Sequence, residues 1–278
     1  MLYINFNGNL VEESAVVFGA ANRLRFGDGF FESMRMFHGK VAFMDAHFER
    51  IIQSARLLHI HLPETHNKAF FEREILKLAE ANQCRFARIR IQFYRVGEGR
   101  YLPTDNNCGF VIEMQNDGVE LYALHKLKKV DVSVLHSKPA HAMGNVKSSS
   151  ALLYVLASIE AKERGLDEMI LLNTDGDICE ALTSNLFMVK EGVVHTPPLQ
   201  SGCVDGVMRK KAIEILLSNQ VQVHQRNCNI SDIENASELF LTNASKGIQQ
   251  VETFGNKAFA AGDVAALLTD KLNRLVVQ

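Results

Sequence analysis

The sequence predicts an α+β protein with two domains, and three observations support this prediction. Its 278 residues are enough for two ordinary domains. Hairpin signals and amphipathic helices are mixed along the chain, without the strict alternation of strand and helix that builds a doubly wound parallel sheet. A polar and basic stretch interrupts the pattern near the middle. We therefore expect an N-terminal α+β domain over residues 1–118, an interdomain linker over 119–128 and a C-terminal domain over 129–278.

Turn residues and hydrophobic periodicity define the elements expected before the linker. Asn7-Gly8 is the strongest signal for a two-residue hairpin. In residues 86–95, Arg88 and Arg90 share one face of a strand whose other face is apolar. The elements expected are a hairpin about Asn7-Gly8, a strand after Gly29, helices over 45–60 and from Thr65 onward, and strands over 86–95 and 109–115.

The C-terminal part shows the same mixture of signals. Three serines, Ser148–Ser150, offer N-caps to a helix that ends before Gly165, and residues 231–234 have the spacing of a capping box. The elements expected are strands over 130–134, 168–173, 178–190, 193–196, 221–225 and 238–243, and helices over 148–164, from about Val207 and over 262–275.

Composition excludes several classes of protein. A formal net charge of −2 gives no electrostatic reason to expect a nucleic-acid partner. The longest apolar run is far shorter than the roughly 20 residues that span a bilayer, so we expect no membrane partner. Five dispersed cysteines fit reduced thiols in a cytoplasmic protein better than a disulfide framework.

Two constellations are weak candidates for function. Gly27-Asp28-Gly29 lacks the third glycine and the strand–helix unit of a nucleotide-binding fingerprint. His59 and His61 share a strand-like face but have no third ligand nearby, so we predict no metal site.

A set of motifs carries a more specific signal. Each is weak alone, but together they resemble, in order and spacing, the class IV (fold type IV) pyridoxal-phosphate enzymes, which include branched-chain aminotransferases, D-amino-acid aminotransferases and aminodeoxychorismate lyases. The resemblance implies a D-amino-acid aminotransferase-like fold, with a smaller N-terminal α/β sandwich and a larger C-terminal pseudo-barrel domain. The motifs lie at residues 26–32, 47–50, 143–150, 180–187, 196–197, 206–209 and 238–242.

The resemblance implies pyridoxal 5′-phosphate as the cofactor, with Lys147 and Glu180 at its reactive end. Lys147 matches the lysine that holds the cofactor as a Schiff base and moves the proton during catalysis, a role that suits a buried amine. Glu180 matches the glutamate beside the pyridine nitrogen, where a carboxylate stabilises the protonated ring.

The resemblance also implies a site for the cofactor's phosphate. Arg50 matches the family's phosphate-binding arginine. The backbone amides of Val207 and Met208 open a helix, where N–H groups and the helix dipole suit a dianion. Relatives often have Ser or Thr where this chain has Asn243 and Ala244. We expect the Ala244 amide to contribute there, with a side chain supplied by Asn243 or by the neighbouring serine.

Four further residues match positions that surround the substrate in the family. Phe26 and Phe31 stand where aromatic pocket residues occur, and Arg100 stands where D-amino-acid aminotransferases and the lyases place a carboxylate-binding arginine. Arg88 resembles an arginine near the active site of branched-chain enzymes. By the same resemblance we expect a homodimer that acts on a small-molecule amino acid and a 2-oxo acid.

Three functions remain open. Transamination is preferred, because Glu32 resembles the transaminases. Elimination of pyruvate from aminodeoxychorismate is the alternative, because Met208 resembles the lyases. Branched-chain specificity is disfavoured by Leu152, since those enzymes favour tyrosine at that position. The third function is a cofactor-binding protein without catalysis, and retention of Lys147 together with Glu180 argues against it.

Overall fold

The computed structural model describes residues 2–15 and 23–277, and the chain divides into two compact units. One unit runs to Leu121 and also takes in Lys147–Ser150. The other comprises Tyr122–Val146 and the chain from Ala151 onward. Each unit combines helices with one or more sheets, which confirms the predicted two-domain α+β class. The return of Lys147–Ser150 to the first unit is a feature that the sequence did not indicate.

The first unit is built on an antiparallel sheet with the strand order β2-β1-β6-β5-β3-β4. Its two long helices are α1 (Met44–Leu57) and α2 (Lys68–Ala81). The predicted hairpin is confirmed at Asn7-Gly8, where both residues have positive φ angles. The strands are β1 (Tyr3–Phe6), β2 (Asn9–Glu12), β3 (Gly29–Phe37), β4 (Lys40–Val41), β5 (Ala87–Arg95) and β6 (Cys108–Asn116).

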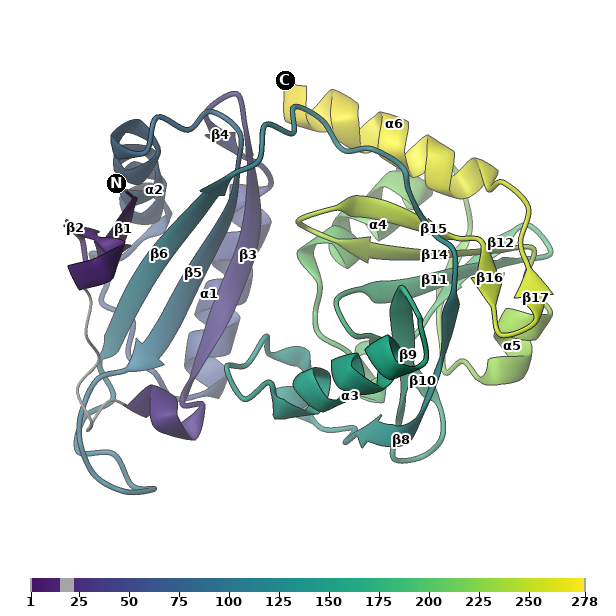
Figure 1. Ribbon diagram of the computed structural model, residues 1–278, viewed down its shortest axis with the longest axis horizontal. Helices are drawn as coiled ribbons and strands as arrows, with labels where there is room; N and C mark the ends of the chain where they lie inside the picture. The colour runs from purple at the N-terminus through teal and green to yellow at the C-terminus, as the bar shows by residue number, and fades with distance from the viewer. Residues whose placement is uncertain (1, 16–22, 278) are drawn as a thin grey trace. The chain divides into compact units, whose positions relative to one another are not determined.

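One face of this sheet is mostly apolar, with the buried Glu32 among its side chains, and the helices cover it. Phe71 of α2 packs with its ring against Phe93 of β5 and Phe110 of β6. Helix α1 packs along β3 (Figure 1). Because side chains alternate along a strand, the opposite face carries the aromatic Phe31 beside polar residues that include Ser33, Arg90 and Gln92. The two helices therefore cover the face opposite to the one that carries Phe31 and Arg90.

The second unit contains two sheets. In one, the strand order is β10-β9-β8-β16-β17, and in the other it is β13-β12-β11-β14-β15-β7. The first set is β8 (Val130–Lys138), β9 (Glu168–Asn173), β10 (Ile178–Ala181), β16 (Thr253–Phe254) and β17 (Lys257–Ala258). The second set is β7 (His125–Leu127), β11 (Asn185–Lys190), β12 (Val193–Thr196), β13 (Val223–Gln225), β14 (Glu238–Asn243) and β15 (Gly247–Val251).

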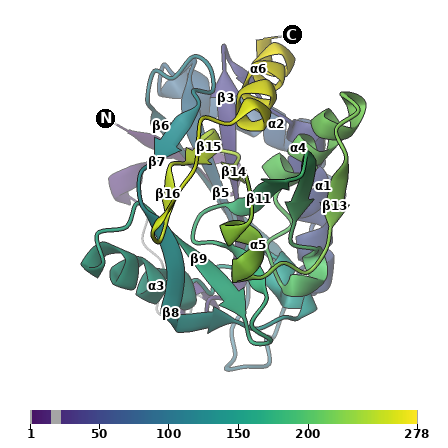
Figure 2. The same cartoon turned by 90° about the vertical axis from the view of Figure 1, so that its right-hand side faces the viewer.

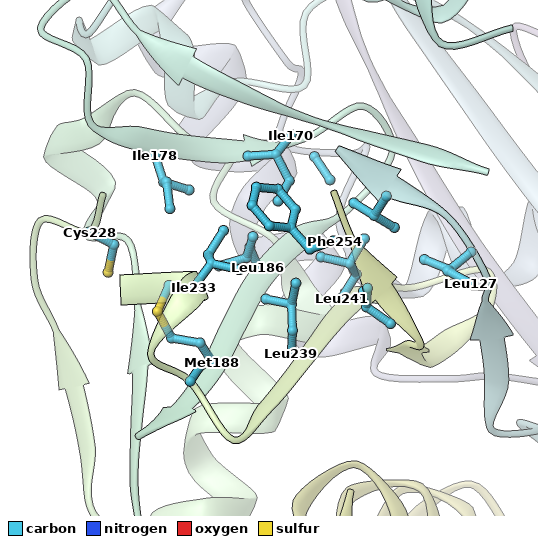
Figure 3. Packing of buried hydrophobic residues seen from close by; sticks show 14 residues of the cluster. Leu127, Ile170, Ile178, Leu186, Met188, Cys228, Ile233, Leu239, Leu241 and Phe254 are labelled. Carbon is cyan, nitrogen blue, oxygen red and sulfur yellow. The ribbon is translucent and has the colours of Figure 1, made fainter. Parts of the chain in front are cut away.

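The core of the second unit lies between these sheets. Ile170 and Phe254 come from the first sheet, whereas Leu186 and Leu241 come from the second, and all of them belong to one buried cluster (Figure 3). This packing of two sheets about one core is the predicted pseudo-barrel. Burial of large aliphatic side chains is worth about 1.5–3 kcal/mol each, so the cluster supplies a large share of the stability.

The helices of the second unit lie outside this core. Helix α3 lies against β8 and β9 (Figure 2), and α6 lies over β15 (Figure 1). None of the helices that the structure describes is long and apolar enough to cross a membrane. The helices are α3 (Leu152–Glu163), α4 (Val207–Ser218), α5 (Ile230–Glu234) and α6 (Asp263–Val277).

Part of the predicted linker is ordinary secondary structure of the second unit. Within residues 119–128, His125–Leu127 forms β7, which pairs in parallel with β15. The Tyr122 amide donates to Asn273 Oδ1 at 2.9 Å. A three-residue strand at a sheet edge has too few positions to show periodicity, which explains why its pattern resembled a loop.

Candidate active site

The segment that carries Lys147 extends the sheet of the first unit. The Phe31 amide donates to the Lys147 carbonyl at 2.9 Å, and the Ser149 amide donates to the Gly29 carbonyl at 3.0 Å. These bonds attach the segment to the start of β3. A Cβ atom at Gly29 would lie 2.2 Å from the carbonyl oxygen of Phe93. Only glycine therefore allows the close approach of β5 at the end of β3 to which this segment is attached.

The ring of Phe31 contacts two cationic side chains. Lys147 Nζ lies 4.6 Å from the ring centroid, and Arg90 Cζ lies 3.7 Å from it. Arg90 also donates to Gln92 Oε1 at 2.9 Å, and Gln92 donates to Ser149 Oγ at 2.6 Å. Burial lowers the pKa of Arg90, but an arginine stays charged in proteins. The ring of Phe31 therefore holds the amine of Lys147 and the guanidinium of Arg90 close to each other.

Arg90, which was not among the sequence candidates, lies closer to this group than Arg88. In the register of β3 and β5, Arg90 is opposite Ser33, whereas Arg88 is opposite Arg35, two pairs further along the strands. Arg88 is also exposed. Alternation correctly placed both arginines on one face. Choosing between them needed the register with β3, which the sequence alone does not provide.

Phe26 and Arg100 lie on exposed segments of the first unit. Phe26 ends the short 3-10 helix η2 (Arg23–Phe26) and tilts against the ring of Tyr101, 6.0 Å away between centroids. Arg100 is exposed, and its carbonyl accepts a hydrogen bond from Arg23 Nη1 at 2.9 Å. The structure therefore shows how the Arg100 loop is held but does not bring Arg100 to the ring of Phe31.

A buried acid fixes Arg50. The Glu32 carboxylate accepts from Arg50 Nε at 2.7 Å and from Arg50 Nη2 at 2.6 Å. His47 Nδ1 lies 2.6 Å from the second Glu32 oxygen. All three side chains are buried. A bidentate pair of this kind fixes the plane of the guanidinium as well as its position.

The protonation states of this group follow from its charges. Burial alone would raise the pKa of Glu32, but Arg50 and His47 outweigh it and lower that pKa to about 2. Burial lowers the pKa of His47, against the opposing effect of Glu32. An ionised Glu32 is only an acceptor, so His47 donates from Nδ1. The group therefore combines a carboxylate, a neutral imidazole and a guanidinium.

In the second unit, Glu180 is surrounded by donors. Its Oε1 accepts from Lys138 Nζ and from the Tyr154 hydroxyl, both at 2.6 Å. Its Oε2 accepts from the Val204 amide at 2.8 Å. Lys138 also donates to the Gly144 carbonyl at 2.9 Å. Glu180 and Lys138 are both buried, so the structure holds a desolvated ion pair at the predicted cofactor glutamate.

The turn that precedes Lys147 is tied to the segment beside Glu180. Asn145 Nδ2 donates to the carbonyls of Leu199 and Cys203 at 2.8 and 2.7 Å. The Asp205 amide donates back to the Asn145 carbonyl at 3.0 Å. Asn145 ends the 3-10 helix η3 (Ala142–Asn145), two residues ahead of Lys147. The turn that ends two residues before Lys147 is thus fixed within the second unit.

The start of α4 is open to an anion. Gly206 occupies the N-cap position, and no side chain caps the helix. A Cβ at Gly206 would lie 1.9 Å from Asn185 Oδ1, which excludes the larger capping residues. Val207 and Met208, both buried, begin the helix. The first amides of a helix have no intrahelical partner, so this end suits a phosphate.

Two buried polar atoms strengthen the fit to a phosphate-bearing cofactor. Arg209, in the first turn of α4, donates to the Pro197 carbonyl at 3.0 Å and to Gln225 Oε1 at 2.8 Å, both of them neutral acceptors. Arg209 Nε and Thr242 Oγ1 are buried and have no hydrogen-bond partner among the described residues. Buried donors are normally satisfied, so such atoms point to a missing ligand or water. Thr242 is a further candidate that the sequence did not single out.

The loop after β14 uses Asn243 for its own structure. Asn243 Oδ1 accepts from the amides of Ser245 and Lys246 at 3.1 and 2.8 Å, and Nδ2 donates to Ser184 Oγ at 3.0 Å. The Asn243 side chain is therefore engaged in the turn, which leaves the Ala244 amide and the Ser245 side chain as the candidates expected from this loop.

Comparison with known families agrees with these observations. The family model described as amino-transferase class IV matches residues 29–254. A Methanocaldococcus jannaschii protein with a provisional name as a branched-chain-amino-acid aminotransferase is 31% identical over 259 residues, covering 89% of this chain and 86% of that protein. A D-alanine aminotransferase of Bacillus licheniformis is 25% identical over 262 residues, covering 92% of this chain and 90% of its own.

Solved structures share the fold. The branched-chain aminotransferase of Thermoproteus uzoniensis aligns with a TM-score of 0.90 at 22% identity, covering 99% of this chain and 95% of its own. A provisionally named 4-amino-4-deoxychorismate lyase from Legionella pneumophila aligns with a TM-score of 0.86 at 23% identity, covering 95% and 97%. Because both activities occur on this fold, the fold does not distinguish them.

Proposed function

Since the chain belongs to the class IV aminotransferase family, we propose how its own residues hold pyridoxal phosphate, the cofactor on which this family depends. When bound, the cofactor supplies an aldehyde that links to amines and a ring that withdraws electrons. Lys147 is the amine that holds it as a Schiff base. Two observations support this assignment most directly. The backbone of Lys147 is hydrogen-bonded to β3, and its Nζ contacts the Phe31 ring, which the Arg90 guanidinium also contacts.

The cofactor's ring nitrogen and phosphate each have candidate partners. Glu180 binds the ring nitrogen, because its Oε2 retains a lone pair beyond the one that the Val204 amide occupies. The phosphate is bound by Arg50 and by the backbone amides of Val207 and Met208. The Ala244 amide adds a donor. Support comes from the fixed guanidinium of Arg50 and from the open start of α4.

We propose Arg90 as a residue that binds a substrate carboxylate. Its planar fork of N–H donors matches a carboxylate bidentately, and it is already oriented by Phe31 and Gln92. Phe31 provides an apolar wall beside it. With the cofactor bound, Lys147 would be the amine that takes the proton from the substrate Cα and passes it on, which is general base and acid catalysis by one group. The product of a full cycle is a new amino acid from a 2-oxo acid.

Two measurements test the assignment of Lys147. The purified protein is expected to be yellow, and borohydride is expected to fix the cofactor on the peptide that contains Lys147. The Lys147→Ala protein is expected to be colourless and unlabelled, with unchanged circular dichroism. Labelling that persists in this variant would remove Lys147 from the assignment.

The reaction itself is tested by a direct comparison of substrates. We expect transamination of amino acids from a panel of D- and L-forms with 2-oxoglutarate, followed by the appearance of glutamate. Branched-chain and D-alanine substrates belong in the panel, because relatives carry those names.

The lyase reaction is the second candidate, and Met208 is the observation that favours it. Its side chain is buried in the first turn of α4, at a position where aminotransferases usually have threonine. Incubation with aminodeoxychorismate separates the two candidates. Release of pyruvate and p-aminobenzoate without turnover of any amino acid would establish the lyase instead.

A homodimer is proposed from the surface of α3. Four large apolar side chains of this helix are exposed, and two more are exposed on β8, which packs against it. A monomeric protein seldom exposes so large an apolar surface. A second copy of the chain is the occupant that the family resemblance implies. The residues are Leu152, Val155, Leu156 and Ile159 on α3, and Val134 and Leu135 on β8.

The proposed location is the cytoplasm. All five cysteines are free thiols, and four of them are buried. Reduced thiols persist in a reducing compartment. Fractionation of cells that express the tagged protein tests this location.

A further inference from the structure

The feature of the second unit that the proposed function leaves unexplained is Lys138. Its ammonium is buried and lies 2.6 Å from Glu180 Oε1, in a site where Glu180 is itself buried. Removing two charges from water is costly, and such a pair is kept in a fold for stability only when its geometry is good. One member of this pair, Glu180, is nevertheless the carboxylate that matches the family's cofactor-binding glutamate.

The donors around Glu180 are distributed unevenly over its two oxygens. Oε1 accepts from both Lys138 and the Tyr154 hydroxyl, whereas Oε2 accepts, among the residues that the structure describes, from the Val204 amide alone. A carboxylate has about four lone-pair positions, so one remains on Oε2. The side chain cannot rotate without losing two strong bonds. Its remaining position is therefore fixed in direction.

Lys138, like Glu180, has several contacts that fix its position. It donates to the Gly144 carbonyl at 2.9 Å as well as to Glu180, and its ammonium lies 5.5 Å from the centre of the Tyr154 ring. Gly144 belongs to η3, the turn that leads to Lys147. Lys138 thus joins the ring-binding acid to η3, the turn that comes shortly before Lys147 in the chain.

Tyr154 complements this cation as a neutral donor. Burial, followed by the adjacent Glu180 carboxylate, raises the pKa of Tyr154 well above its ordinary value. The phenol therefore stays protonated and always donates to Oε1. Its hydrogen bond stabilises the negative charge of Glu180 without adding a charge to the site.

We propose that Lys138 is a positioning residue which, with Tyr154, keeps Glu180 ionised and directs its Oε2 toward the ring nitrogen of the cofactor, so that the proton between them resides on the ring. This inference rests on the proposed function of Glu180. Lys138 contacts Oε1 and is nearer to the carboxylate than to any group bound at Oε2. Because Coulomb energy falls with distance, it stabilises the negative charge on Glu180 more than it opposes a positive charge beyond it. A protonated ring is the stronger electron acceptor.

The first arm of the test uses the full-length protein without cofactor. Glutamate labelled with ¹³C at the side-chain carboxyl reports protonation, and the signal lost in Glu180→Gln identifies the residue. At pH 7 we expect an ionised Glu180 in the parent and in Lys138→Arg. In Lys138→Met we expect a protonated Glu180, because a buried acid without its counter-charge takes up a proton. An ionised Glu180 in folded Lys138→Met would overturn the proposal.

The second arm uses the holoenzyme with pyridoxal phosphate labelled with ¹⁵N in the ring. We expect the chemical shift of a protonated ring nitrogen in the parent and in Lys138→Arg, and a shift toward the unprotonated ring in Lys138→Met. The kcat of Lys138→Met is expected to fall about 100-fold, as for other losses of orientation, with a smaller change in KM. An unchanged ¹⁵N shift in Lys138→Met would overturn the proposal even if activity falls.

Two further measurements keep the outcome interpretable. If Lys138→Met does not fold, Lys138→Gln replaces it, because glutamine removes the charge but retains a hydrogen-bond donor. For Lys138→Gln we expect the results given above for Lys138→Met, in both the ¹³C signal of Glu180 and the ¹⁵N signal of the cofactor ring. A parent protein that binds no cofactor covalently would reject the proposed function, while the ¹³C arm would still report on the pair of Lys138 and Glu180. The two failures are therefore distinguishable.

Discussion

Glu32 shows how a single residue links stability to the candidate site. It is fully buried and accepts from both Arg50 and His47. Because the pKa of Glu32 is lowered from 4.5 to about 2 in the folded protein, its contribution to stability is present above pH 4.5 and is lost as the pH falls through this interval. The acid that orients the predicted phosphate ligand is thus also a source of acid sensitivity.

Replacing Glu32 tests this link. We expect Glu32→Gln to lower the free energy of unfolding at pH 7 by about 3 kcal/mol, because it leaves a buried guanidinium without its counter-charge. Urea unfolding at pH 7 and pH 3 measures the effect. The difference between parent and variant is expected to shrink at pH 3. Glu64→Gln, at an exposed position, is the control and should change little at either pH.

Arg90 and Arg88 make a matched pair for substrate binding. Loss of a charge-assisted hydrogen bond costs about 1.5–3 kcal/mol, so Arg90→Leu is expected to raise the KM for the 2-oxo acid roughly 10- to 100-fold. Arg88→Leu removes the same charge from the same sheet face at an exposed position. Steady-state kinetics on both variants decide between them. A larger KM effect in Arg88→Leu would restore the residue that the sequence favoured.

At the scale of elements, local signals found the helices but misplaced their starts. Helix α2 begins at Lys68, and its cap is Asn67, whose Oδ1 accepts from the Phe70 amide at 3.0 Å, rather than Thr65. The serines before α3 do not cap it either, because the N-cap is Ala151 and no side chain bonds there. Ser149 instead pairs with the strand β3. Several residues near a helix start have suitable side chains, and only the path of the chain selects one.

The cap of α2 is a direct test at this scale. We expect Asn67→Ala to destabilise the protein by about 1 kcal/mol, the usual cost of losing an N-cap. Thr65→Ala, at an exposed position two residues earlier, should stay within about 0.5 kcal/mol. Thermal unfolding of both variants provides the comparison. Equal losses would mean that Thr65 also supports the helix.

The whole molecule depends on surfaces as well as on cores. The exposed apolar side chains of α3 predict association with a second copy, and light scattering tests this. We expect Ile159→Glu to shift the protein from dimer to monomer, because a buried unpaired charge opposes the contact. Leu217→Glu on α4 is the matched control, since Leu217 is 56% exposed and Ile159 is 49% exposed. Dissociation by both variants alike would assign the effect to general destabilisation.

Much of this molecule could be predicted from the sequence because its signals are local or ordered along the chain. Alternation in β5 placed Arg90 on a polar face, and the ordered motifs identified Lys147, Glu180 and Arg50 as candidates. The predicted α+β class and the class IV family are confirmed. Residue patterns carry this information because periodicity and motif spacing belong to the chain itself.

Only the tertiary structure decided which of these residues meet. The pairing of Lys147–Ser149 with β3, the choice of Arg90 beside Phe31, and the contact of Lys138 with Glu180 all join residues that are far apart in the sequence. Such contacts depend on strand register and on burial, and a shift of one residue in register would turn each side chain to the opposite face. The sequence by itself therefore determined the chemistry available to this protein, and the packing of strands determined where that chemistry is brought together.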